Sequence, residues 1–291
     1  MAQEKNGKPI CIITGATDGI GKRTAEVLAR KGYDLALVGR DGEKGLSVVS
    51  ELQKQTGQAA IRFFKADLSS VKQVKKLSED IQSAYDHIDV LINNAGAYFH
   101  NFKKTSEENE RTFALNHLAY FQLTNRLIPL LSEAPAGRIV NVASNAHFRN
   151  DLDFENLQGL KNYSGWTEYC RSKLSNIMFT YELHERLKDE NLTVNALHPG
   201  FVKSQFGMNN QGFFKGLLSF SQKLFAISIE EGARTSIYLA SDSDVEGISG
   251  LYFYKCKAVS SSKQSKNIAK QRKLWQKSEE LIAAGLSLAN S

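Results

Sequence analysis

A tyrosine and a lysine four residues apart are the first candidates for chemistry in this 291-residue chain. Of its ten tyrosines, only Tyr169 is followed four positions later by a lysine, Lys173. On a helix this spacing places both side chains on one face. A free phenol has a pKa of about 10, and lowering it by about 3 units needs roughly 4 kcal/mol of preferential stabilisation of the phenolate. A neighbouring ammonium supplies such stabilisation, so the pair could exchange a proton with a substrate near neutral pH.

A glycine-rich turn follows a short β-branched run and leads into a helical pattern. The turn consists of Gly15, Ala16, Thr17, Asp18, Gly19, Ile20 and Gly21. Glycines permit a tight turn and a close approach of the backbone to a phosphate, and the N-terminus of the next helix offers free N–H groups. The spacing is not G-x-G-x-x-G, since three residues separate the first two glycines. The turn indicates a phosphate-bearing cofactor, although a plain strand-to-helix connection could use the same glycines.

The elements that must position these residues alternate along the chain. Strands are predicted at 10–14, 34–39, 60–66, 89–93, 138–144, 193–197 and 250–254, and helices at about 19–31, 43–56, 70–85, 106–132, 166–190 and 230–241. This alternation predicts an α/β fold with a parallel sheet covered by helices on both faces. Apolar runs such as Cys11-Ile12-Ile13 are typical of strands that are buried on both sides. We expect a single domain over 1–291.

Three motifs occur in order: TGATDGIG at 14–21, NNAG at 93–96 and YCRSK at 169–173. Together they resemble the short-chain dehydrogenase/reductase superfamily, and the resemblance spans about 10–284. It implies a Rossmann-like, doubly wound, mostly parallel seven-stranded sheet in three α/β/α layers. It also implies hydride transfer between a nicotinamide cofactor and a carbonyl or alcohol carbon.

The resemblance implies a role for each catalytic candidate. Tyr169 is expected to exchange the proton of the substrate oxygen, and Lys173 to lower the pKa of Tyr169 and bind the nicotinamide ribose. Ser144, at the end of a predicted strand, is expected to orient the substrate oxygen as charge develops, although a strand-end cap would suit it too. Asn116 matches a fourth position that holds a water between Lys173 and solvent. Its alternative is a helix-interior side chain bonded to the backbone.

Arg40 follows the second predicted strand, where an acid would bind a ribose 2′-hydroxyl and repel a 2′-phosphate. A guanidinium can bind a phosphate through paired, charge-assisted hydrogen bonds, so we expect NADP(H). Asp41 beside it and Asp18 in the glycine turn argue against this choice, and a plain surface arginine is the alternative. The other cofactor contacts implied by the resemblance are Asp67 and Leu68 near the adenine, Asn93, Ala95 and Gly96 beside the adenosine, and Pro199, Gly200 and Val202 near the nicotinamide.

Ser144 and Tyr169 are 25 residues apart, about twice the interval usual in the superfamily. This interval, with SKLSNIMFTYEL at 172–183 and NALHPGFV at 195–202, resembles the retinol dehydrogenase and protochlorophyllide reductase branch. Membrane-type retinol dehydrogenases begin with a hydrophobic anchor that this sequence lacks, so a retinoid substrate is not assumed. An aromatic-rich segment at about 200–228 could close as a lid over a small apolar aldehyde, ketone or alcohol. Ordinary packing against the body is one alternative, and a shallow membrane contact by 213–225 together with the basic tail is another.

The net charge of +6 comes from a C-terminal arm at about 255–291. Residues 255–277 contain eight Lys or Arg and no Asp or Glu, so the rest of the chain has a net charge of −2. Nucleic-acid binding is therefore not expected. The arm could pack as a helix on the body, or it could dock on an anionic membrane surface or an acidic partner.

The cysteine count and the hydropathy of the sequence bear on where in the cell the protein is located. Cys11, Cys170 and Cys256 are an odd number without metal-ligand spacing, and no metal is expected. A membrane-spanning helix needs about 20 mostly apolar residues, and neither such a run nor a signal peptide is visible. We expect a cytoplasmic enzyme.

Two alternatives to a carbonyl reductase stay open. A double-bond reductase of the same superfamily would reduce its substrate without forming an alcohol. A non-catalytic protein that senses NADP(H) and binds a protein partner would typically lack the Tyr169 and Lys173 pair. Members of the superfamily are often homodimers or homotetramers that pair through the helices around Asn116 and Tyr169, and the sequence is compatible with either.

Overall fold

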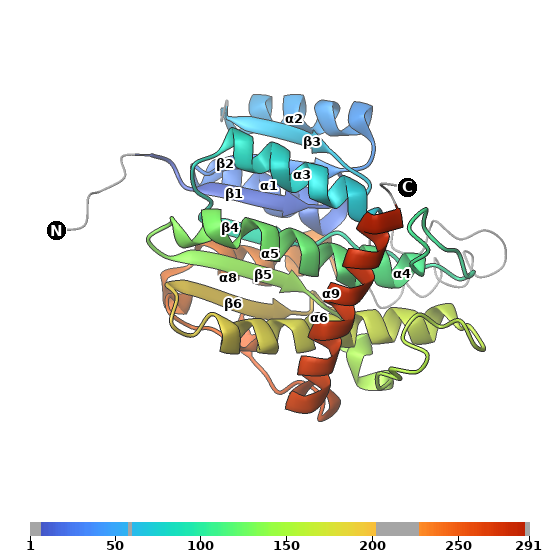
Figure 1. Ribbon diagram of the computed structural model, residues 1–291. Helices are drawn as coiled ribbons and strands as arrows, with labels where there is room; N and C mark the ends of the chain where they lie inside the picture. The colour runs from blue at the N-terminus through green and yellow to red at the C-terminus, as the bar shows by residue number, and fades with distance from the viewer. Residues whose placement is uncertain (1–6, 58–59, 202–226, 289–291) are drawn as a thin grey trace.

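Eight strands form one sheet among the described residues of the computed structural model (Figure 1). The structure describes residues 7–57, 60–201 and 227–288. The strands are β1 (Ile10–Thr14), β2 (Asp34–Gly39), β3 (Ile61–Lys65), β4 (Val90–Asn93), β5 (Gly137–Val142), β6 (Leu192–Leu197), β7 (Tyr252–Tyr254) and β8 (Lys257–Ala258). Their order is β3-β2-β1-β4-β5-β6-β7-β8, and only the β7–β8 pair is antiparallel. The order reverses between β1 and β4, which is where open α/β sheets bind ligands.

Helices cover both faces of the sheet, and each face has its own apolar core (Figure 1). One face carries α1 (Gly19–Arg30), α2 (Gly42–Thr56) and α8 (Ile229–Ser241), and the other carries α3 (Val71–Ala84), α5 (Ala119–Ser132) and α6 (Gly165–Arg186). The predicted Rossmann-like three-layer fold is thus confirmed. The sheet has one strand more than the predicted seven, because two residues of the C-terminal arm pair with β7 as the short β8.

The long helix predicted at 106–132 is divided into three pieces. It starts only at α4 (Arg111–Phe113), continues through a π-helical turn, η1 (Ala114–Leu118), and becomes α5. The start is delayed because the Glu110 carboxylate caps α4, accepting hydrogen bonds from the backbone N–H groups of Thr112 and Phe113. Such single π turns interrupt α-helices frequently at functional sites.

The basic arm folds into a helix that packs on the body. After the short turns η3 (Ser243–Val245) and η4 (Gln264–Lys266), α9 (Ile268–Leu288) lies against α6 and α3 (Figure 1). Trp275 of α9 is 7% exposed, with its ring centroid 4.7 Å from that of Phe121 and 5.8 Å from that of Phe179. The arm therefore completes the core on this face of the sheet.

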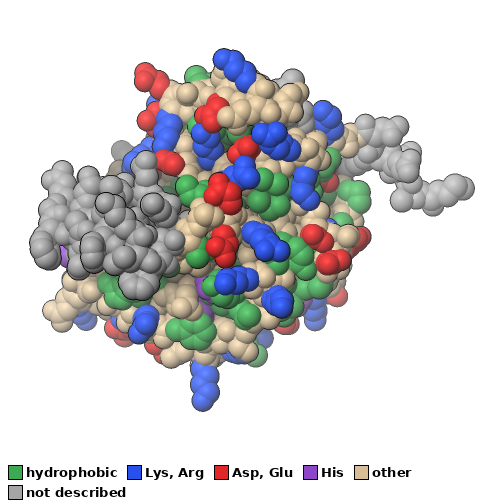
Figure 2. Space-filling model, turned by 180° about the vertical axis from the view of Figure 1, so that it is seen from behind, with side chains coloured by type: hydrophobic (Ala, Val, Ile, Leu, Met, Phe, Trp, Pro, Cys, Tyr) green, Lys and Arg blue, Asp and Glu red, His purple; other side chains and the backbone are tan. Residues whose placement is uncertain are grey.

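On the opposite side of the molecule, basic and acidic side chains are interspersed (Figure 2). Ion pairs such as Lys22–Glu51 and Arg23–Glu26 join neighbouring surface residues of α1 and α2. This face therefore carries no patch of a single charge sign over its described residues.

Candidate active site

A cleft of about 670 Å³ opens at the carboxyl ends of the central strands. Of the residues predicted to bind cofactor or to act in catalysis, those lining it are Gly15, Thr17, Asp18, Gly19, Ile20, Gly21, Arg40, Asp67, Leu68, Ala95, Gly96, Tyr169, Lys173 and Pro199. Segments from six parts of the sequence thus meet at the point where the strand order reverses. The placement is that of a ligand site in an open α/β sheet.

The glycine turn is packed so tightly at Gly15 and Gly21 that neither position has room for a side chain. Gly15 has a φ of +65°, and a Cβ there would lie 2.8 Å from the Cα of Ala95. A Cβ on Gly21 would lie 2.3 Å from the carbonyl oxygen of Gly15. Asn94 holds the turn from the side, since its Nδ2 donates to the carbonyl oxygens of Thr14 and Gly15 at 2.9 and 3.2 Å. The N-terminus of α1 is thereby held open towards the cleft, where a phosphate would fit.

Asp18 and Asp41, the two carboxylates that argued against NADP(H), both bind groups of the protein itself. Asp18 caps α1 by accepting from the N–H of Gly19, and it forms an ion pair with Lys44 at 2.6 Å. Burial raises the pKa of Asp18, but the hydrogen bonds from Lys44 and Gly19 outweigh it and the pKa is lowered. Asp41 caps α2 by accepting from the backbone N–H of Lys44 at 3.1 Å.

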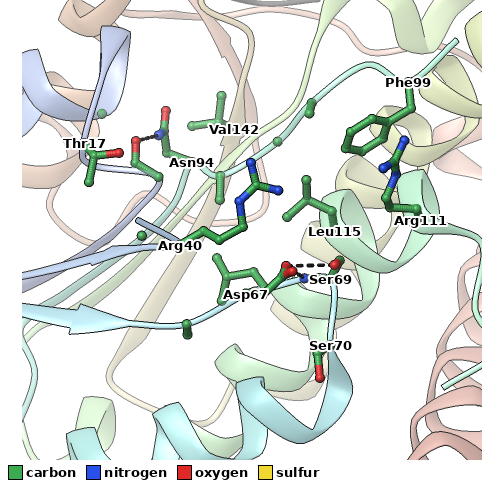
Figure 3. Close-up of a pocket in the computed structure, with 18 of the residues that line it drawn as sticks. Thr17, Arg40, Asp67, Ser69, Ser70, Asn94, Phe99, Arg111, Leu115 and Val142 are labelled. Atoms are coloured by element: carbon green, nitrogen blue, oxygen red, sulfur yellow. Dashed lines mark hydrogen bonds between the residues drawn. The ribbon is translucent and has the colours of Figure 1, made fainter. Parts of the chain in front are cut away.

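Arg40 points into the cleft with its guanidinium near Leu115 (Figure 3). Asp67 accepts hydrogen bonds from the backbone N–H and the hydroxyl of Ser69, at 3.0 and 2.8 Å. Within the described part of the chain, Arg40 forms no ion pair with a carboxylate. Its positive charge is therefore available to an anion that enters the cleft.

Helix α6 carries Tyr169 and Lys173 to the inner end of the cleft, where both are buried. The Lys173 Nζ donates to the carbonyl oxygen of Val142 at 2.9 Å and lies 6.0 Å from the centre of the Tyr169 ring. Burial lowers the pKa of Lys173 to about 7. Burial raises the pKa of Tyr169 above its ordinary value, while a hydrogen bond with Ser144 lowers it in part. The expected lowering by Lys173 is thus not seen in the protein alone, and the phenol keeps its proton at neutral pH.

Ser144 follows β5 and forms the strand-end cap that was the alternative considered for it, while its role towards a substrate oxygen stays a prediction. Its Oγ accepts a hydrogen bond from the backbone N–H of Ala146 at 3.2 Å, which caps the 3-10 turn η2 (Asn145–Arg149). Its hydroxyl also bonds with the Tyr169 phenol. Since the Ala146 N–H occupies one lone pair, the hydroxyl proton is free to be donated on the other side.

Asn116 lies in the π turn with its amide bonded to the protein on every side. Its Oδ1 accepts from the N–H of Ala97 at 2.9 Å, and its Nδ2 donates to the carbonyl oxygen of Ala97 and to the Ser172 hydroxyl, each at 3.0 Å. This is the alternative of a helix-interior polar group. The side chain still borders the site, because a Cβ on Gly96 would lie 3.1 Å from the Lys173 Nζ and 3.3 Å from the Asn116 Oδ1. A water-holding role remains a prediction.

Three predicted cofactor contacts do not line the cleft. Asn93 is fully buried, and its Nδ2 donates to Thr124 and Asn141 at 2.8 and 2.9 Å, because the last residue of β4 turns towards α5. Ala16 is buried in the core beneath the turn. Gly200 has a φ of +90° and faces Ile227. Val202 and the predicted lid at 202–226 lie outside the described residues.

Asn94 lies within the predicted range Asn93–Gly96 and lines the cleft. Arg111 also lines the cleft, but the sequence did not predict it. No pattern links Arg111 to Phe99, over whose ring its guanidinium lies at 3.7 Å (Figure 3). Burial lowers the pKa of Arg111.

These residues fit a nicotinamide dinucleotide. The turn lacks the Cβ atoms that would fill it at Gly15 and Gly21, and Arg40 forms no ion pair with the described residues, so both suit phosphates. A family model described as short chain dehydrogenase matches residues 9–212. The chain belongs to the short-chain dehydrogenase family. As a member, it is an oxidoreductase that acts on CH–OH or carbonyl groups and binds a nicotinamide nucleotide.

The curated relatives of this short-chain dehydrogenase include retinol dehydrogenases. The chain is 37% identical to retinol dehydrogenase 11 of Mus musculus over 94% of its own length and 86% of the relative's. It is 38% identical to retinol dehydrogenase 12 of Bos taurus, with the same coverage. Retinol dehydrogenase 14 of Homo sapiens is 36% identical, over 95% of this chain and 87% of that protein. The predicted retinol dehydrogenase-like branch is confirmed.

Solved structures agree with this assignment. A protein from Mycobacterium paratuberculosis superposes with a TM-score of 0.76 at 28% identity, over 95% of this chain and 94% of the other. A short chain dehydrogenase from Shigella flexneri complexed with NADP has a TM-score of 0.65 at 26% identity, over 88% of this chain and all of the other.

The cytoplasmic location expected from the sequence is contradicted by these relatives. That expectation separated the chain from retinol dehydrogenases of the membrane type, yet the chain falls in the same branch as retinol dehydrogenases 11, 12 and 14. In the described part of the chain, no helix is both long and apolar enough to cross a bilayer. The prediction of a cytoplasmic protein is therefore withdrawn.

Proposed function

We propose that the chain interconverts an apolar aldehyde or ketone and its alcohol with NADP(H), and that Tyr169 is the acid and base. The observation that carries the proposal is that Tyr169 and Lys173 line the same cleft as Arg40. Tyr169 can transfer a proton at one end of the cleft, and Arg40 carries a positive charge at the other. A nucleotide with a nicotinamide at one end and a 2′-phosphate at the other would use both.

The glycine turn and the N-terminus of α1 would hold the pyrophosphate, and Arg40 the 2′-phosphate. When bound, the cofactor supplies a hydride for the carbonyl carbon. Tyr169, whose phenol holds its proton because burial raises its pKa, donates that proton to the carbonyl oxygen. Ser144 donates a second hydrogen bond to the same oxygen and thereby stabilises the developing charge. The protonated phenol is the form that can donate to a carbonyl oxygen, and the phenolate is the form that can accept a proton from an alcohol.

Aromatic side chains beside Tyr169 support an apolar substrate. The rings of Tyr98 and Trp166 lie 6.2 and 5.8 Å from the Tyr169 ring, measured between centroids. Trp166 is 49% exposed although it is a large apolar side chain. An apolar molecule that approaches Tyr169 would cover this indole, and removing apolar surface from water is favourable. Retinol, named in the relatives, belongs to this substrate class.

NADP(H) is supported by the unpaired Arg40 and by two solved relatives, at 26% and 25% identity, that are complexed with NADP and NADPH. The test is to follow consumption of NADPH and of NADH by the purified protein with a panel of apolar aldehydes, ketones and quinones. Turnover with NADPH on apolar carbonyls is expected. A preference for NADH would refute the cofactor assignment.

Tyr169→Phe separates an enzyme from a nucleotide-sensing protein. The variant should lose turnover while NADPH binding changes by less than about threefold, because the phenol acts on the substrate oxygen. Tyr163→Phe is the matched control, since the Tyr163 hydroxyl contacts Phe99 and Glu110 and has no lysine four positions later. Turnover that survives in Tyr169→Phe would exclude Tyr169 as the acid and base.

A further inference from the structure

His147 is a fully buried histidine whose ring is bonded through both nitrogens to backbone groups. It lies three residues after Ser144, in η2. Its Nδ1 is 2.8 Å from the carbonyl oxygen of Ser144, and the backbone N–H of Ser262 donates to its Nε2 at 3.1 Å. The ring thus joins the strand end that carries Ser144 to a segment 115 positions later in the chain.

The two partners determine where the ring proton lies. The Ser262 N–H can only donate, so Nε2 carries no proton and accepts. The Ser144 carbonyl can only accept, so the proton of the neutral imidazole lies on Nδ1 and is donated to it. Burial lowers the pKa of His147, which keeps the ring neutral.

Neighbouring rings fix the plane of the imidazole. The Tyr252 ring meets it edge-on at 5.0 Å between centroids, and the Phe148 ring lies at 4.0 Å. Because the ring cannot turn, its bond to Ser144 has a defined direction. The Ser144 carbonyl also accepts from the backbone N–H of His147 at 3.2 Å. Two hydrogen bonds therefore hold the peptide that follows the Ser144 Cα.

The partner on the other side is itself anchored. Ser265 donates to the carbonyl oxygen of Ser262 at 2.7 Å, and its hydroxyl bonds to Ser261 at 2.8 Å. The Ser261 hydroxyl is 2.7 Å from that of Tyr181, a residue of α6. Since Ser261, Ser262 and Ser265 are all buried, this part of the arm is a fixed support for the Nε2 side of the ring.

Resting on the proposed function, we propose that His147 is a positioning residue that orients Ser144 for the substrate oxygen and is held for this task by Ser262. The hydrogen bond to the Ser144 carbonyl fixes the backbone at Ser144 and with it the direction of its Cα–Cβ bond. The Ser144 hydroxyl consequently stays beside Tyr169. Through this ring the C-terminal arm contacts the strand end that carries Ser144.

Two variants of similar shape test the hydrogen bonds of Nδ1 and Nε2 one at a time. His147→Asn places an amide N–H near the position of Nδ1 and keeps the bond to Ser144, but it loses the acceptor for Ser262. His147→Gln places its amide near the position of Nε2 and keeps that acceptor, but it loses the donor to Ser144. The measurements are kcat and KM for carbonyl reduction, NADPH affinity and the thermal midpoint. His184→Asn is the control, because its Nδ1 has a similar bond, 2.9 Å to the Ser249 hydroxyl, outside the cleft.

The expected result is that His147→Gln loses about tenfold to a hundredfold in kcat, in line with an error of about 1 Å in a catalytic group. His147→Asn should lose only about threefold in kcat, because it keeps the donor to Ser144 and lacks only the support from Ser262, and NADPH affinity should stay unchanged in both. The proposal would be overturned if the losses of kcat in the two variants paralleled their losses in thermal midpoint, whether or not the donor to Ser144 is kept. An unchanged kcat in His147→Gln would also overturn it. Loss of turnover in Tyr169→Phe beside normal turnover in His147→Gln would refute this inference alone. Turnover in Tyr169→Phe, or none in wild type, would refute the proposed function and this inference with it.

Discussion

Replacing Trp275 by alanine tests whether α9 is part of the folded core. The indole is 7% exposed and packs on Phe121 and Phe179, so its removal should cost about 3–5 kcal/mol of the free energy of unfolding. The Arg186 guanidinium, 4.0 Å from the ring centroid, adds about 0.5–1 kcal/mol. With an unfolding entropy of about 2.1 cal/mol/K per residue, a loss of about 4 kcal/mol lowers the melting temperature of 291 residues by about 7 °C.

The assay is urea unfolding followed by circular dichroism, with the thermal midpoint as a second measure. Trp166→Ala is the matched control, since the only other tryptophan of the chain is 49% exposed and should cost less than about 1 kcal/mol. If Trp275→Ala unfolds at the same urea concentration as Trp166→Ala, α9 does not belong to the core and the packing described above is wrong.

Three further changes address the cleft. Arg40→Ala should weaken NADPH binding by about tenfold to a hundredfold and NADH binding by less than about threefold, because only NADPH has the 2′-phosphate. An equal loss in titrations with both cofactors would remove Arg40 from the phosphate site. Gly21→Ala should abolish binding of both, since its Cβ would lie 2.3 Å from the Gly15 oxygen; normal binding would contradict the tight turn. Because burial raises the pKa of Tyr169, alcohol oxidation, which needs the phenolate, should rise about tenfold per pH unit between pH 6 and 9, whereas reduction stays level. Equal pH profiles in initial-rate assays would exclude this assignment.

Local patterns made much of the fold and cleft predictable. The distance from Tyr169 to Lys173 is set by the helix itself, and the glycine turn is a contiguous stretch between one strand and one helix. The parallel sheet with helices on both faces follows from the alternation of strands and helices. Arg40 was predictable because strand ends meet at one edge of the sheet.

Contacts between distant segments were not predictable. The bond from Ser262 to His147 joins residues 115 positions apart, and no periodicity announces it. Packing of the basic arm on the body was one of the predicted alternatives, but the contacts of Trp275 with Phe121 and Phe179 were not predicted. Asn93 was assigned to the cleft because a motif does not show which residue of a strand end turns inward. The π turn at Asn116 depends on bonds to Ala97, a contact that a helical pattern does not contain.

Synthesis on the ribosome gives the packing of α9 a further consequence. The face formed by α5 and α6 is complete once Arg186 has emerged, but the helix that covers it begins only at Ile268, about 80 residues later. At a synthesis rate of about 5–20 residues per second, α9 begins to emerge roughly 4–16 s after α6 is complete. During that time the nascent chain exposes apolar rings, including Phe121 and Phe179, to chaperones and to neighbouring chains. A chain that stops before Ile268 lacks this cover, so we expect it to aggregate more readily than the full chain.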